Sequence, residues 1–116
     1  MIEIDVVMDG AGVLSSCTIA GHAGAAPKGG DIVCAAVSVL AGTAHKILSE
    51  AEGIKVWSKT PERGLFDLKL EYTQAGRDFL SAAGLFLITG LASIAGEYPA
   101  YCRMKVHQHH TINLME

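Results

Sequence analysis

Alternating apolar and polar residues mark three segments of the chain as half-buried strands, at residues 2–8, 65–72 and 101–107. Two further strands are predicted at 13–20 and 54–59, because short turns rich in Gly, Pro and Asp join each of them to a neighbouring strand. The pattern therefore predicts two hairpins and one C-terminal strand.

The remaining apolar residues recur with helical spacing. One helix is predicted from Asp31 to about Glu52, because Asp is a favoured N-cap and Gly53 is the residue type that usually follows a helix end. A second is predicted from about residue 75 to 97, where Pro99 stops it. The predicted buried stripe of the first helix consists of Val33, Ala36, Val37, Leu40, Ala44, Ile47 and Leu48.

The element order β-β-α-β-β-α-β predicts an α+β fold, a two-layer sandwich. We expect an antiparallel or mixed sheet with both helices on one face. A chain of 116 residues has room for one such core. Residues 1–107 are predicted to form a single domain, and residues 108–116 a C-terminal tail.

Composition narrows the classes of function. Half of the residues are apolar and 18% are charged, which excludes a disordered chain. The formal charge of −3 argues against a nucleic-acid partner, which needs clustered Lys and Arg. Three widely spaced cysteines make a poor disulfide framework, and the first residues lack the basic segment of a signal peptide. A cytoplasmic location is therefore expected.

Residues 79–96 carry no charge over 18 positions, which just reaches the length of a transmembrane helix. Ser, Thr and Gly interrupt this segment, and no Lys or Arg cluster marks a cytoplasmic end. We expect a helix buried against the sheet rather than a membrane contact. Its apolar surface exceeds what one sheet face covers, so a homodimer is predicted.

Cys34 is the strongest candidate for a reactive residue. If Asp31 caps the helix, Cys34 lies in the first turn, where the partial positive charge of a helix N-terminus lowers a thiol pKa. Cys34 also lies off the predicted stripe, on a line with Ser38, Ala41 and His45. The alternative is a small buried apolar residue, the commonest fate of a free Cys. Position alone leaves both interpretations open.

His22 favours the reactive interpretation. It lies just after the second strand, near the start of a loop predicted over residues 21–30, which can return it to the helix start. A thiolate beside an imidazolium is the nucleophile and acid–base pair of cysteine hydrolases. His45 is a poorer base, because eleven helical residues place it ~16 Å from Cys34. The alternative for His22 is a surface histidine.

Other parts of an acyl-transfer site are available nearby. Backbone N–H groups at the helix start are candidates for binding an oxyanion. Gly29 and Gly30 allow close approach of a substrate backbone, and residues 24–30 are predicted to form a mobile lid. Asp31 is expected to cap the helix rather than to orient His22.

The other cysteines and histidines are predicted to have no catalytic role. Cys17 and Cys102 fall at strand positions typical of the core. His107, His109 and His110 resemble a metal-ligand cluster, but a flexible tail rarely holds a closed ligand set. No metal site and no cofactor are predicted.

Two motifs carry a family resemblance. Gly-His-Ala-Gly at residues 21–24 and Gly-Asp-Ile-Val-Cys-Ala-Ala-Val-Ser at 30–38 resemble the bacterial ribosomal-processing cysteine protease family, Prp. The 12-residue step from His22 to Cys34, the chain length and the element order are also similar to that family.

The resemblance implies a cysteine endopeptidase that removes an N-terminal extension from the twenty-seventh protein of the large ribosomal subunit, cutting after paired aromatic residues. It also implies a homodimer, and a loop that moves over the substrate. The catalytic dyad maps to His22 and Cys34, and further motif residues map to Gly21, Asp31 and Ser38. The alternative is a non-catalytic ribosome-assembly or interaction module with a redox-sensitive Cys34.

Overall fold

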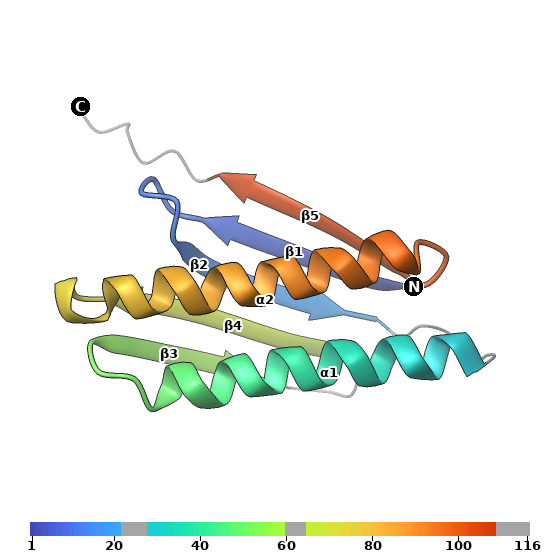
Figure 1. The fold of residues 1–116 in the computed structure, drawn as a ribbon, viewed down its shortest axis with the longest axis horizontal. Coiled ribbons are helices and arrows are strands. Elements are labelled where there is room, and N and C mark those ends of the chain that lie inside the picture. The colour runs from blue at the N-terminus through green and yellow to red at the C-terminus, as the bar shows by residue number, and fades with distance from the viewer. Residues whose placement is uncertain (22–27, 60–64, 109–116) are drawn as a thin grey trace.

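Five strands and two long helices follow one another in the predicted order (Figure 1). The computed structural model describes residues 1–21, 28–59 and 65–108, and of residues 28–31 the backbone only. The elements are β1 (Ile2–Met8), β2 (Leu14–Ala20), α1 (Lys28–Ser49), β3 (Ile54–Lys59), β4 (Leu65–Tyr72), a short 3₁₀ turn η1 (Gln74–Gly76), α2 (Arg77–Glu97) and β5 (Cys102–Gln108).

The strands form one mixed sheet in the order β3-β4-β2-β1-β5. Neighbouring strands are antiparallel except for β1 and β5, which pair in parallel with Ile4 opposite Met104. Both helices cover the same face of this sheet and run in opposite directions (Figure 1). The predicted two-layer α+β sandwich is therefore confirmed, and the sheet is of the mixed kind.

Strand β5 includes Gln108, which was predicted to begin the tail. The side-chain amide of Gln108 donates a hydrogen bond of 2.6 Å to the backbone carbonyl of Asp9. This contact ties the last residue of β5 to the turn that joins β1 and β2. The folded part of the chain therefore extends at least to residue 108.

Helix α1 begins three residues earlier than predicted and ends three residues before Glu52. Asp31 lies inside the helix, so its predicted role as the N-cap is wrong. Pro27 directly precedes Lys28 in the sequence, and proline favours the first positions of a helix because its φ is already helical. This second start signal prevails over the capping preference of Asp31. Gly53, with a φ of 76°, reverses the chain between the end of α1 and β3.

The buried side of α1 is rotated slightly from the predicted stripe. Ala41 is buried, whereas Ile47 is 41% exposed, so two of the predictions for this helix are wrong. The periodicity alone could not choose between them, because both residues border the same apolar face. The buried side consists of Val33, Val37, Ala41, Ala44 and Leu48.

Both helices remain apolar on the side away from the sheet. The segments Ile32–Ser49 and Gln74–Glu97 are each long and apolar enough to cross a membrane by length and composition. Helix α2 nevertheless inserts Leu80, Leu87 and Leu91 into the core beneath it. Its outer side leaves large apolar residues uncovered, and Phe86 is 74% exposed.

Candidate active site

Cys34 lies in the second turn of α1, half-buried and packed against the edge of the hydrophobic core. Ser38 follows one turn later and is exposed. On the same side of the helix, the Nε2 atom of His45 is hydrogen-bonded to the Oγ atom of Ser58 on β3, at 2.9 Å. This bond holds the C-terminal half of α1 against β3.

The predicted first-turn position of Cys34 is wrong, because α1 already begins at Lys28. The influence of a helix dipole falls off within the first turn, and only the first four N–H groups of a helix lack an intrahelical partner. Six residues separate the start of α1 from Cys34, which is ~9 Å along the helix axis. The helix start is thus too distant to supply the activation or oxyanion donors expected from it.

Two glycines of the predicted loop lie in a helix instead. Gly29 and Gly30 have helical backbone in the first turn of α1, so the predicted loop over residues 21–30 is wrong for its last three residues, and the mobility of the lid over residues 24–30 stays a prediction. Residues 22–27 lie outside the described residues, and with them the rest of that lid. The side chain of Asp31 lies outside them as well.

Gly21 fixes how the chain leaves β2 toward His22. Its φ of 99° lies in the left-handed region, and a Cβ atom at this position would collide with the backbone carbonyl of Met1. Only glycine fits both requirements. Because His22 lies outside the described residues, its distance from Cys34 stays a prediction.

The three cysteines differ sharply in their surroundings. Cys17 and Cys102 are buried, as predicted, with 0% and 2% of their surfaces exposed. Burial raises the pKa of Cys17 to about 12, and the nearby carboxylates of Asp5 and Asp67 add to the effect. Burial also raises the pKa of Cys102, with a further contribution from Cys34. Of the three thiols, only that of Cys34 is partly open to solvent.

This difference predicts selective alkylation. Because the thiolate is the reactive form, a group with a pKa of about 12 has roughly one molecule in 10⁴ ionised at pH 8. Iodoacetamide added to the native protein at pH 8 should therefore modify Cys34 and spare Cys17 and Cys102. Peptide mass spectrometry measures this, with denatured protein as the control in which all three react. Equal labelling of Cys17 in the native protein would contradict the burial described above.

His45 and His107, the histidines among the described residues, have partners away from Cys34. The ring of His45 packs edge-on against Phe66, with 6.5 Å between ring centroids, in addition to its bond with Ser58. His107 places Nε2 3.2 Å from a carboxylate oxygen of Asp5 on the exposed side of the sheet. Within residues 1–21, 28–59 and 65–108, no three or more His, Cys, Asp or Glu side chains converge as metal ligands.

Comparison with known sequences decides the family. Residues 1–103 match the family model described as cysteine protease Prp. The chain belongs to this family. Prp proteins are cysteine proteases, so the enzyme class predicted from the two motifs is confirmed. Comparison with curated proteins gives no significant match.

Solved structures agree with the fold of a Prp protease. A Streptococcus mutans protein superimposes with a TM-score of 0.80 at 24% identity, over 94% of this chain and 96% of that chain. The ribosomal processing protease Prp of S. aureus, in complex with a substrate peptide, superimposes with a TM-score of 0.78 at 20% identity, over 91% and 99% of the two chains. A second S. aureus Prp structure holds a covalently linked product peptide, with a TM-score of 0.77 at 20% identity and the same coverage.

Proposed function

We propose that this Prp protease cuts a ribosomal protein with Cys34 as its nucleophile and His22 as the general base. The assignment of Cys34 as the nucleophile rests on how far each of the three cysteines is exposed. A cysteine protease needs a thiol that substrate can reach, and Cys17 and Cys102 are buried. Cys34 is half-buried in the second turn of α1, and α1 begins at the same end of the sandwich at which β2 ends (Figure 1).

The assignment of His22 is supported by the positions of His45 and His107, the histidines that the structure describes. His45 is hydrogen-bonded to Ser58, ~16 Å along α1 from Cys34. His107 lies near the end of β5, and five strand residues, ~17 Å, separate it from Cys102 at the start of that strand. His22 follows Gly21 directly in the sequence, and β2, after which both residues come, ends at the same end of the sandwich at which α1 begins (Figure 1).

The proposed reaction follows from these two groups. His22 takes the proton of the Cys34 thiol, and the thiolate attacks the carbonyl carbon of the scissile peptide bond. When the resulting tetrahedral intermediate collapses, His22 returns the proton to the departing amine. Water then hydrolyses the thioester, with His22 again acting as the base, and the free thiol is restored. Gly21, Asp31 and Ser38 are proposed to support this site.

The proposed substrate is the twenty-seventh protein of the large ribosomal subunit, from which the enzyme would remove an N-terminal extension in the cytoplasm. Membership of the Prp family and the ribosomal processing activity of the S. aureus relative support this proposal. The chain has a net charge of −3, which suits a basic substrate protein.

The direct test is incubation of the enzyme with the full-length ribosomal protein of the same organism. We expect mass spectrometry to find one cut near its N-terminus, and no cut in the mature form that lacks the extension. Tight binding without any cut would instead support the non-catalytic assembly module. The absence of both binding and cutting would reject the proposed substrate.

We also propose that the enzyme is a homodimer that buries the outer side of α2. Leu85 and Phe86 are 65% and 74% exposed, and Phe79 lies one heptad before Phe86 on the same side. Contiguous apolar side chains of this size on a soluble domain usually mark an interface. Ala82 and Ser93, which lie among them, are small enough for another backbone to approach closely.

Substitution of Phe86 by Glu tests this interface, because a carboxylate buried between two copies lacks a partner. We expect sedimentation to give a dimer for the wild type and a ~12 kDa monomer for Phe86→Glu. Trp57→Glu is the matched control, since Trp57 is also a half-exposed aromatic residue but lies on the opposite face of the sheet. A monomeric wild type at micromolar concentration would reject the dimer.

A further inference from the structure

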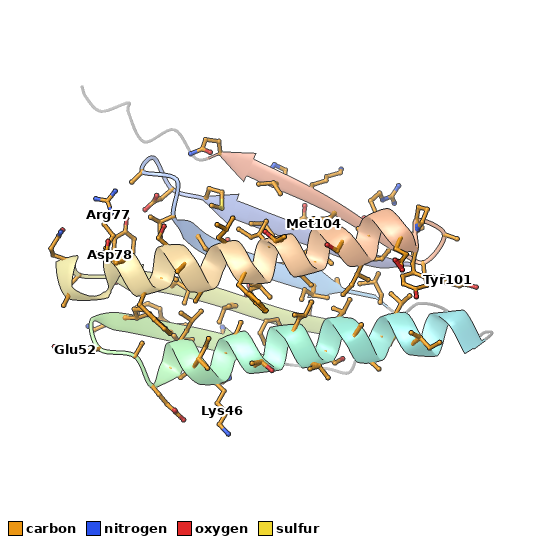
Figure 2. All side chains as sticks on the ribbon, viewed as in Figure 1. Lys46, Glu52, Arg77, Asp78, Tyr101 and Met104 are labelled. Atoms are coloured by element: carbon orange, nitrogen blue, oxygen red, sulfur yellow. The ribbon has the colours of Figure 1, made fainter. Side chains whose placement is uncertain are left out.

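A groove of about 540 Å³ runs between the C-terminal half of α2 and strand β5. Its helix side consists of Ala92, Ala95 and Gly96, whose small side chains leave the space open. Its strand side presents the flexible, apolar side chain of Met104, labelled in Figure 2, and that of Val106, which is more exposed. A volume of this order accommodates several large side chains of a ligand.

One end of the groove lies toward Cys34, the proposed nucleophile. Cys102 lines the groove, and Cys34 is close enough to it to add to the effect of burial in raising the pKa of Cys102. Met1 also lines the groove, and its backbone carbonyl packs against Gly21, the residue before His22. Figure 1 shows the start of α1, the end of β2 and the α2–β5 turn at this same end of the sandwich. A polypeptide lying in the groove therefore leads toward Cys34.

The strand side of the groove is an open sheet edge. Strand β5 is the last strand of the sheet, and within the described part of the chain no strand pairs with its outer edge. An edge strand has backbone N–H and C=O groups free to pair with an added extended segment. Val106, on the groove side of this edge, is 54% exposed. The edge and the groove together suit an extended peptide whose alternate side chains are apolar.

We propose that the groove between α2 and β5 binds the part of the substrate polypeptide next to the scissile bond. The segment would extend along β5 and place a large apolar side chain against Ala92 and Ala95. This inference rests on the proposed proteolytic function and adds a specificity-determining surface to it. Arg103 contributes mainly its alkyl chain to the rim, since its guanidinium lies 3.6 Å from the carboxylate of Glu3.

The substitution Ala92→Phe fills the groove and tests the proposal. The probe is a fluorescent dodecapeptide that spans the cut site of the ribosomal protein, with a second peptide in which the large apolar residues before the cut are Ala. Binding is measured by fluorescence polarisation in a Cys34→Ala background, so that it does not depend on cleavage. We expect Ala92→Phe to weaken binding of the first peptide at least about tenfold, the effect of losing one large apolar contact.

Ala75→Phe is the matched control, because Ala75 is exposed in η1 at the far end of α2 and lies outside the groove. This variant should bind the first peptide as the parent does. The second peptide should bind the parent weakly, and Ala92→Phe should bind it with the same affinity. The reason is that the Ala substitutions in the peptide and Ala92→Phe in the enzyme remove the same contact. This comparison does not require the groove variant to be fully stable, because replacing the peptide's own residues leaves the enzyme untouched.

Equal binding of the first peptide to the parent and to folded Ala92→Phe would overturn the proposal. The proposal would also be overturned if Ala92→Phe changed the oligomeric state of the enzyme and left peptide binding unchanged. The groove would then be a contact between two copies of the chain. A different result would reject the proposed proteolytic function: the wild-type enzyme would bind the peptide in this groove but would not cut it.

Discussion

Replacing Cys34 by Ala should abolish cleavage of the ribosomal substrate. Loss of a covalent nucleophile typically costs orders of magnitude in turnover, about 10⁶-fold in well-studied hydrolases. Cys34 is half-buried at the edge of the core, so removal of its sulfur should have only a modest effect on the free energy of unfolding. The measurement is single-turnover cleavage, together with thermal unfolding to show that the variant is folded.

The serine variant sharpens this prediction. Cys34→Ser replaces the thiol with a hydroxyl, which does not ionise near neutral pH, so this variant should also be inactive. Cys17→Ala is the control, because it removes a thiol from the buried core and should leave the rate per folded molecule unchanged. Full activity in Cys34→Ala would end the assignment of this residue as the nucleophile.

Replacing His22 by Ala should lower the rate of cleavage by about 10²-fold or more, the usual contribution of a general acid–base group. A partner imidazolium stabilises the Cys34 thiolate, so its loss should also raise the pH at which Cys34 is alkylated. Substrate affinity should change much less, because His22 acts in the chemical steps. The rate of iodoacetamide modification as a function of pH measures the second effect without any substrate.

His45→Ala serves as the matched control for His22→Ala. His45 is bound to Ser58 and packed on Phe66, so its loss should affect stability slightly and leave the alkylation profile of Cys34 unchanged. If His22→Ala and the wild type share one alkylation profile, the two residues do not interact. The rate-limiting base would then have to be another group.

Much of the fold was predictable because each strand alternates with a period of two and each helix repeats its own apolar pattern. Both hairpins, both helices and the two-layer arrangement follow from those local patterns. Strand order does not, because the parallel pairing of β1 with β5 joins segments about 100 residues apart. The start of α1 was misplaced because Pro27 and Asp31 are competing local signals, and only the folded chain shows that the first prevails.

The candidate site was predictable in part for a similar reason. The sequence distinguishes Cys34 from Cys17 and Cys102, because the latter two fall on the inward side of strands. It places Cys34 one helical turn too close to the start of α1. For that reason the helix dipole was expected to make the thiol reactive. The groove could not be predicted, since Ala92 and Met104 come together only when α2 packs beside β5.

The pairing of β1 with β5 also bears on how the enzyme is made. Strand β1 is synthesised first, but Ile2 finds its partner Cys102 only when almost the whole chain has been synthesised. Until then one edge of β1 is unpaired, and the groove lacks its strand side. Contacts between such distant segments form late in folding, because closing a long loop costs entropy before pairing repays it. The complete sheet, and with it the strand side of the groove, therefore forms only after β5 has been synthesised, up to Gln108 opposite Met8.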